Sequence, residues 1–367
     1  MSITVGFIGF GLIGGSVAKA LKKYSDEYIT CSYNRYYPKA NASLENAVKD
    51  GVLDNIYTSI EDFAACDLIF LCAPVMLNVS YLEQLKGIIK ENCIITDVGS
   101  VKTSIHTEVE RLNMQKNFIG GHPMTGSDRT GYENASELLF ENTYYLLTPT
   151  DSTPDKAVDM MMKIIHIIKA IPYVLDNVKH DEITAAISHL PHIIASSLVN
   201  LVHDNDDEDA HMKTFAAGGF KDITRIASSS PQMWQNICLT NTDSILKYLD
   251  LYRSSLDKTM EALKAGDSDY LYRMFESSRD YRDSIPKGRP GTLPDIHEIY
   301  VDVPDVPGII AIIATILSSN SISIRNIGIV HNREYENGVL RIEFYNDNDE
   351  NDARNALKQY PFPVYDR

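Results

Sequence analysis

The chain contains few cysteines, and they form no pattern that would define a disulfide framework or a metal centre. Its 367 residues include five, which are scattered, contain no CxxC pair and mostly fall in apolar, strand-like runs: Cys31, Cys66, Cys72, Cys93 and Cys238. Such a distribution is typical of buried thiols in a reducing compartment. We therefore expect a cytoplasmic protein with neither a disulfide framework nor a zinc site.

The sequence also lacks basic clusters, long apolar runs and room for a leader. Lys and Arg total 34 against 50 Asp and Glu, so the formal net charge is −16, which argues against nucleic acid or an anionic membrane as a partner. No apolar run reaches the ~18 residues of a membrane span. Residues 1–4 lead directly into the first predicted strand, so we expect no signal peptide.

A glycine-rich turn near the start predicts a dinucleotide-binding unit. An apolar run at 5–8 is followed by GFGLIGGS at 9–16, a helical pattern, and a second strand-like run at 29–33. A lone GxGxxG is a weak signal, but this one lies inside a βαβ unit, which is the context that dinucleotide binding requires. Backbone N–H groups and the helix dipole would meet the pyrophosphate. The predicted contacts are Gly9, Gly11, Leu12, Ile13 and Gly14.

The end of the second predicted strand departs from the usual fingerprint. An acidic residue there normally binds the ribose 2′-OH, whereas this chain has Asn34 followed by Arg35. Asn34 can still accept that hydrogen bond, but it does not repel a 2′-phosphate, and Arg35 could pair with one. The expected cofactor is therefore NAD, with NADP left open.

Alternating strand and helix patterns continue to about residue 150. They predict an α/β Rossmann-type domain, a doubly wound parallel sheet, over residues 1–150. Its further apolar strands are expected at 67–74, 93–98, 117–120 and 144–149. Ligands bind beyond the carboxyl ends of such strands. Those ends carry Ala73 and Pro74, the segment 99–102 and the segment 121–123.

The rest of the chain changes character twice. Residues 151–285 are almost wholly helical in pattern, and this much apolar surface on helices favours a substrate-binding domain that forms a homodimer. Residues 286–296 are rich in Pro and Gly and are the predicted linker. Residues 297–367 alternate as βαββαβ, which predicts a ferredoxin-like module.

Two polar residues at strand ends are candidates for proton chemistry. His122 lies in a glycine-rich segment that we expect to be a loop at the ligand edge of the sheet, where it could reach a nicotinamide ring. A single histidine could equally be structural. Ser100, at a neighbouring strand end, could orient the imidazole so that one nitrogen stays free as a proton acceptor.

The helical segment offers a candidate cation and a pair of histidines. Arg225 is expected to be partly buried and could clamp a substrate carboxylate, the alternative being an internal salt bridge to Asp222. His189 and His192 have a spacing that a metal would accept, but further ligands are lacking nearby and Pro191 disturbs the helix. We expect them to face substrate or to be core histidines.

Several motifs taken together resemble the prephenate dehydrogenase family, in its form with a C-terminal ACT domain. They follow one another along the whole chain: GFGLIGGS (9–16), DVGSVK (97–102), GHPMTGS (121–127), SHLPH (188–192), GGFKDITRIA (218–227) and PQMW (231–234). The middle motifs are more specific than the first.

The resemblance implies NAD-linked oxidative decarboxylation of prephenate to 4-hydroxyphenylpyruvate and CO2, in tyrosine biosynthesis. His122 would accept the proton of the ring hydroxyl, and Ser100 would hydrogen-bond that histidine or the hydroxyl. Arg225 would bind a substrate carboxylate, and His189 and His192 would line the pocket. Ser127 and Asp128 would lie at its mouth. The family often has Glu in place of Asp128, so a role of this residue in gating the pocket is open. It often has Arg in place of Lys221, so a role for a guanidinium group at that position is also open.

The resemblance also implies regulation and leaves rival functions open. An ACT domain would bind tyrosine as a feedback inhibitor, with Asp305 and Gly308 as its expected contacts. Arogenate dehydrogenase has the same chemistry on an amino analogue, and a catalytically silent amino-acid sensor would use the ACT module alone. A β-hydroxyacid dehydrogenase shares the first domain but usually has a catalytic lysine in the helical domain, where we find no convincing candidate.

Overall fold

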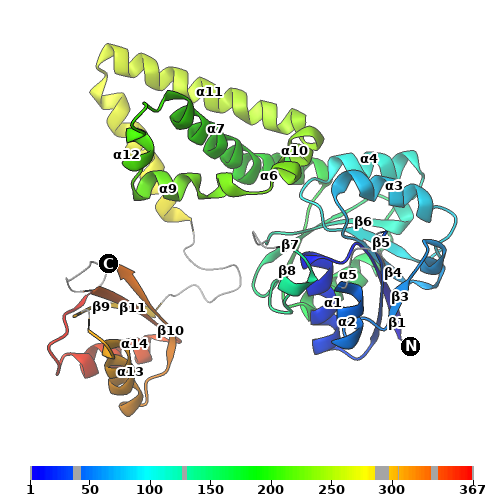
Figure 1. Cartoon of the computed structure of the whole chain (residues 1–367), viewed down its shortest axis with the longest axis horizontal. Helices are drawn as coiled ribbons and strands as arrows, with labels where there is room; N and C mark the ends of the chain where they lie inside the picture. Colours follow the sequence, from blue (N-terminus) through cyan, green and yellow to red (C-terminus); the bar gives the residue numbers. More distant parts are fainter. Residues whose placement is uncertain are drawn as a thin grey trace. The chain divides into compact units, whose positions relative to one another are not determined.

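The computed structural model describes residues 2–35, 43–125, 130–285, 297–304, 306–331 and 338–365 (Figure 1). The chain divides into two compact units, Met1–Ile285 and Pro286–Arg367. The predicted linker, 286–296, lies outside the described residues, as do Ser127, Asp128 and Asp305.

The first unit begins with an eight-stranded sheet in the order β3-β2-β1-β4-β5-β6-β7-β8. Its strands are β1 (Ile3–Ile8), β2 (Tyr28–Tyr33), β3 (Asn55–Tyr57), β4 (Leu68–Leu71), β5 (Ile94–Asp97), β6 (Phe118–Pro123), β7 (Tyr144–Pro149) and β8 (Ile171–Val174). The central strands are buried on both faces, as in β4, where every residue of LIFL is buried. Such strands need helices on both sides of the sheet.

Helices cover both faces of this sheet (Figure 1). One face packs against α1 (Leu12–Tyr24), α2 (Ser43–Lys49) and α5 (Asp155–Ile167), and the other against α3 (Val75–Leu85) and α4 (Thr103–Arg111). Short 3-10 turns occur at η1 (Glu61–Ala65), η2 (Gln115–Asn117) and η3 (Tyr132–Asn134). The predicted Rossmann-type α/β architecture is confirmed.

The sheet differs from the prediction in two respects. β7 runs antiparallel to β6, and β8 is parallel to β7, so the sheet is mixed rather than wholly parallel. The sheet also ends at Val174 and not near residue 150, because α5 packs its Met161 and Ile165 into the core of the sheet and leads to β8. The sequence pattern did not reveal β8, because it contains Pro172 and is half exposed.

The remainder of the first unit is helical. Its helices are α6 (Asn177–Thr184), α7 (Leu190–Asn205), α8 (His211–Thr214), α9 (Gly218–Thr224), α10 (Pro231–Thr240), α11 (Thr242–Ala265) and α12 (Ser268–Ser284), with a 3-10 turn η5 (Arg225–Ser228). A π-helical turn, η4 (Ala185–His189), joins α6 to α7 just before Pro191. Proline lacks an N–H, and a π turn absorbs the misfit within a helix.

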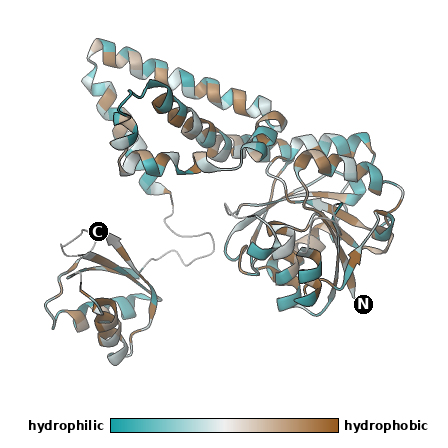
Figure 2. Cartoon of the chain, in the orientation of Figure 1, coloured by the Kyte–Doolittle hydropathy of each residue, from teal (hydrophilic) through white to brown (hydrophobic). Residues whose placement is uncertain are grey.

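Hydrophobic residues recur along these helices (Figure 2), and many of their side chains are exposed. Ile187, Leu201, Leu263 and Phe275 are each more than half exposed. By length and composition alone, the continuous helix Asn177–Asn205 could cross a membrane, and only 17% of its most apolar window is buried. Exposed apolar faces on a helix also mark association with another protein surface.

The second unit is a small antiparallel sheet with two helices. Its strands, in the order β10-β11-β9-β12, are β9 (His297–Val303), β10 (Ile324–His331), β11 (Gly338–Phe344) and β12 (Val364–Tyr365), and its helices are α13 (Ile309–Ser319) and α14 (Asp347–Leu357). Buried and partly exposed residues alternate along β11, as expected for a sheet with one face in the core. Ile313 and Leu317 of α13 complete that core.

Candidate active site

The turn between β1 and α1 leaves space and free donors for a phosphate group. Gly9 has φ +88°, and a Cβ there would lie 2.9 Å from the backbone nitrogen of Ala73, so only glycine fits. A Cβ on Gly14 would lie 2.9 Å from the carbonyl of Gly9, whereas Gly11 faces open space. No side chain caps α1 at Gly11, so its first N–H groups remain available. The turn therefore fits a dinucleotide pyrophosphate.

A cavity of about 490 Å3 opens beside this turn. It brings together Gly9, Asn34, Arg35, Ala73 and Pro74, all predicted cofactor contacts. Leu12 and Ile13 lie in the first turn of α1 and do not line it. Its other lining residues are Tyr33, Cys72, Met76, Leu77 and Tyr81 from the sheet side, and Gln232 and Asn236 from α10.

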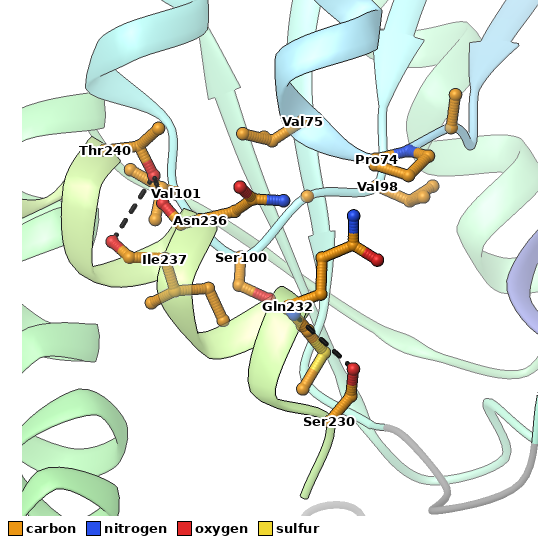
Figure 3. A pocket seen from close by; sticks show the side chains of 13 residues that line it. Pro74, Val75, Val98, Ser100, Val101, Ser230, Gln232, Asn236, Ile237 and Thr240 are labelled. Carbon is orange, nitrogen blue, oxygen red and sulfur yellow. Dashed lines mark hydrogen bonds between the residues drawn. The ribbon is translucent and has the colours of Figure 1, made fainter.

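A second cavity, of about 310 Å3, lies at the carboxyl ends of β4 and β5 (Figure 3). Ser100 and the Ala73–Val75 segment form one wall, and α10 forms the other. The side chains of Gln232 and Asn236 project from α10 toward Pro74 and Val98 in Figure 3, and both also line the first cavity. The hydroxyl of Ser100 has no hydrogen-bond partner among the described residues, so it is available to a ligand.

His122 lies near the end of β6, a strand that continues to Pro123, and not in the loop that its glycines suggested. Its Nδ1 is 2.8 Å from Nε2 of His180 on α6. The predicted orienting contact from Ser100 is therefore replaced by a histidine that sequence reasoning missed. Burial, followed by the nearby His180 and Lys102, holds the pKa of His122 well below its usual value. His122 is thus neutral near pH 7 and able to accept a proton.

A buried ion pair fastens the end of β5 to β6 beneath His122. The fully buried ammonium of Lys102 forms an ion pair with the Asp97 carboxylate and donates a hydrogen bond to the carbonyl of Gly121 at 2.7 Å. The second Asp97 oxygen accepts the N–H of Gly121 at 3.2 Å. Because each group in this pair is hydrogen-bonded to the strand that carries His122, the pair fixes the position of that strand end.

Asp181 joins the helical part to the start of α4. Its carboxylate accepts the backbone N–H groups of Lys102 at 2.8 Å and Thr103 at 2.7 Å, and contacts Nδ1 of His180 at 2.8 Å. Burial alone would raise the pKa of Asp181, but the bonds from His180, Thr103 and Lys102 outweigh it and hold the pKa below its usual value. Asp181 is therefore ionised.

His189 and His192 both contact Trp234. His189 is buried, with Nδ1 3.1 Å from the Asn241 amide, and burial lowers its pKa to about 4. Its ring meets Trp234 edge-on with centroids 6.0 Å apart, whereas His192 is stacked on Trp234 with centroids 3.7 Å apart. The pair is thus held by an aromatic side chain and a hydrogen bond. Among the described residues, one group has the spacing to hold a metal ion, and it lies elsewhere, at His297, Asp347 and Glu350.

Arg225 begins η5 and is exposed, which corrects the expectation of partial burial. It lines neither cavity. Within the described part of the chain it has no hydrogen bond or ion pair, so the alternative of a salt bridge to Asp222 is not found there. Ser127 and Asp128, expected at the mouth of the pocket, lie outside the described residues.

Fold and site together define a Rossmann-type, nucleotide-dependent dehydrogenase with a helical second part. Two family models match this chain: the nucleotide-binding domain of prephenate dehydrogenase over residues 17–174, and its dimerization domain over 176–277. The chain belongs to the prephenate dehydrogenase family. The boundary between the matched domains coincides with the end of β8.

Relatives and solved structures agree with this assignment. A prephenate dehydrogenase from Bacillus subtilis is 39% identical over 98% of this chain and 96% of its own length. The structure of prephenate dehydrogenase from Aquifex aeolicus with hydroxyphenyl propionate and NAD+ is 30% identical, with a TM-score of 0.72 over 78% of this chain and 99% of that one. Synechocystis arogenate dehydrogenase is 29% identical, with a TM-score of 0.69 over 77% and 99%.

Proposed function

We propose that the protein oxidatively decarboxylates prephenate to 4-hydroxyphenylpyruvate and CO2, with NAD+ as hydride acceptor, in tyrosine biosynthesis. The observation that carries this proposal is the placement of Ser100 and His122. Ser100 follows β5 at the carboxyl edge of the sheet and lines the second cavity. His122 lies near the same edge, close to the end of the adjacent parallel strand β6, and lines neither cavity. A hydroxyl and a neutral imidazole at that edge are suited to handling the proton of an alcohol during its oxidation.

The chemistry requires one proton to be held while the ring becomes aromatic. His122 takes the proton of the ring hydroxyl as hydride leaves the same carbon. Loss of CO2 then places the carbon–carbon bond electrons in the ring, and His122 returns its proton to the resulting phenolate oxygen. NAD+, when bound, would be the hydride acceptor. Since aromatisation favours decarboxylation, the chain's residues need to orient the substrate and hold that proton.

Binding of the dianionic substrate requires cations in a chain of net charge −16. We assign this role to Arg225, whose guanidinium is exposed and unpaired among the described residues, and His192 would line the pocket. Ser100 would bind the ring hydroxyl, His189 would line the pocket, and Ser127 and Asp128 would lie at its mouth.

The cofactor assignment is NAD, with NADP as the alternative. Support comes from the glycine turn and from the NAD+ bound to the Aquifex relative. Asn34 and Arg35 line the nucleotide cavity, in place of the acidic residue that would repel a 2′-phosphate. Gly9, Gly11, Leu12, Ile13, Gly14, Ala73 and Pro74 complete the proposed contacts.

The second unit is proposed to be an ACT domain that binds tyrosine as a feedback inhibitor. Its βαββαβ order and its strand order are those of a ferredoxin-like module. Gly308 has φ +88° and caps α13, a position that suits a tight ligand-binding turn. Gly308 and Asp305 are the proposed contacts of the ligand. The proposed organisation is a sheet domain to Val174, a helical domain to residue 285, a linker over 286–296 and the ACT domain over 297–367.

The protein is proposed to be a cytoplasmic homodimer. The exposed apolar helices support the homodimer. They lie within the residues that match the family's dimerization domain, and a second copy would cover their apolar faces. This accounts for the apolar helix Asn177–Asn205 without a membrane.

A second candidate function is arogenate dehydrogenase, favoured by the likeness to the Synechocystis enzyme. The deciding experiment measures kcat/KM with prephenate and with arogenate, each with NAD+ and with NADP+, and repeats the best pair with L-tyrosine. We expect prephenate with NAD+ to be preferred, and tyrosine to inhibit. Preference for arogenate would replace the proposed substrate, and tyrosine binding without any nucleotide reduction would favour the silent sensor.

A further inference from the structure

His180 is a buried histidine that no motif marked, and it links His122 to Asp181. It lies in α6, and its side chain is fully buried. Nε2 is 2.8 Å from Nδ1 of His122, and Nδ1 is 2.8 Å from Oδ1 of Asp181. The two rings are tilted by 60° with centroids 5.0 Å apart, so they meet through their nitrogens and not by stacking.

The proton positions in this chain follow from Asp181. Its ionised carboxylate can only accept, and it already accepts from the backbone N–H groups of Lys102 and Thr103. Nδ1 of His180 must therefore carry a proton and donate it to Asp181. A neutral His180 then has a lone pair on Nε2, so Nδ1 of His122 must donate to it. The remaining nitrogen of His122, Nε2, is left without a proton.

We propose that His180 is a positioning residue that holds the His122 ring and fixes the tautomer in which Nε2 is the free base. The inference rests on the proposed function, because it assumes that His122 accepts the hydroxyl proton. When Nε2 takes that proton, Nδ1 keeps its own and continues to donate to His180. The transient positive charge on His122 is then stabilised through His180 by the Asp181 carboxylate. The same bonds hold when the proton returns to the phenolate.

The attachment of α6 to the start of α4 does not depend on the imidazole of His180. Asp181 alone already fastens α6 to the start of α4 through two backbone N–H groups. Thr184 bonds back to the carbonyl of His180 at 3.0 Å and so stabilises α6 without the imidazole. The His180 ring is therefore not required for these attachments, and its bond to His122 remains to be explained.

The test compares substitutions of His180 that keep or remove the acceptor. His180→Phe keeps a ring of similar size but leaves Nδ1 of His122 without an acceptor. His180→Gln places an amide oxygen near the position of Nε2 and can accept that bond again. We expect His180→Phe to lower kcat by roughly 10²-fold, within the range for a general base, with KM for prephenate nearly unchanged. His180→Gln should recover most of the loss.

A matched control is His106→Phe. His106 is also a buried histidine of the first unit, and it bonds the Thr148 hydroxyl at 2.9 Å rather than His122, His180 or Asp181. The His106→Phe variant should have the wild-type kcat, which would show that replacing a buried imidazole by phenyl does not by itself lower kcat. NAD+ binding to each variant shows that the nucleotide domain is folded, and 15N spectra of histidine-labelled protein report which nitrogen of His122 carries the proton.

The outcomes separate this inference from the function on which it rests. Wild-type kcat in His180→Phe, with His122→Asn impaired, would overturn the positioning role and leave the proposed function intact. Wild-type kcat in His122→Asn would overturn the base assignment itself. A spectrum with the His122 proton on Nε2 in the wild-type protein would also overturn the inference. A higher KM for prephenate with an unchanged kcat in His180→Phe would also overturn the inference, and would indicate that His180 shapes the substrate pocket instead.

Discussion

At the scale of single residues, burial and hydrogen bonding decide how the imidazole of His122 can act. The ring is neutral near pH 7 because its surroundings lower its pKa, and its Nδ1 is occupied by His180. A group with a lowered pKa remains an acceptor over a wide pH range but is a weaker base. Its contribution therefore depends on position, which the Lys102–Asp97 pair and His180 provide.

Replacement of this base gives the first prediction. His122→Asn should lower kcat by about 10²–10⁴-fold, because a positioned proton acceptor contributes that much, while KM for prephenate changes little. Steady-state assays at saturating NAD+ measure both constants. The dissociation constant of NAD+ should stay unchanged as a check on folding. A kcat equal to that of the wild type would refute the role of His122.

The residues of this site differ in how visible they are in sequence. Ser100 and His122 could be proposed because both follow apolar strand runs and are flanked by glycines. His180 could not, because it lies 58 positions from His122 on a helix, and its role arises from a contact that folding creates. The only local signal is the His180-Asp181 pair, and a histidine beside a carboxylate is common on helix surfaces. Arg225 was expected to be partly buried from its apolar neighbours, yet Ile223 beside it is itself exposed.

At the scale of elements, α10 is the helix that faces the sheet across both cavities. Ser230 caps it by accepting the N–H of Met233, and Pro231 starts it. Gln232 and Asn236 are four residues apart, so both project from one side of the helix, and both line both cavities. Each amide can donate to and accept from a bound dinucleotide.

This geometry predicts that α10 contributes to cofactor binding. Gln232→Leu and Asn236→Leu should each weaken NAD+ binding roughly two- to tenfold, the effect of losing a neutral hydrogen bond. Gln235→Leu is the matched control, since Gln235 is exposed on the same helix and lines neither cavity. The fluorescence of the chain's single tryptophan, Trp234, can report the titration. Equal binding by all three variants would show that α10 does not contact the nucleotide.

Elements with a strong local pattern could be predicted from sequence, and those defined by pairing could not. β1, β2, β4 and β5 are runs rich in apolar and β-branched residues, with turn signals after them. β3 and β8 are short and half exposed, so they are recognisable only through the strands that they join. The direction of β7 is likewise set by its hydrogen bonds to β6.

At the scale of the whole molecule, the exposed apolar faces of α7, α11 and α12 require a covering surface. The match to the family's dimerization domain includes α7, α11 and most of α12, which supports the proposal that a second copy covers these faces. Their apolar composition predicted association, but not which faces meet. Buried histidines such as His106 and His189, by contrast, have their hydrogen-bond partners within one chain and couple the stability of that chain to pH.

The last prediction concerns this coupling. His106 and His189 are buried, and burial lowers the pKa of each to about 4, against about 6.5 in an unfolded chain. Between these values the unfolded chain binds protons that the folded chain does not, so the free energy of unfolding falls as the pH falls. By pH 5 the loss should be on the order of 2 kcal/mol for each histidine. Carboxylates with lowered pKa values lose most of their contribution below about pH 5, at the lower edge of this window.

Urea unfolding at pH 7 and pH 5 measures the loss, and His106→Gln isolates one group. The glutamine side chain cannot titrate but can still bond the Thr148 hydroxyl, so the variant should lose about 2 kcal/mol less than the wild type between the two pH values, whatever its stability at pH 7. His166→Gln, at an exposed position on α5, should leave the pH dependence as it is in the wild type. If His106→Gln retains the full wild-type loss, protonation of buried His106 does not contribute to acid destabilisation.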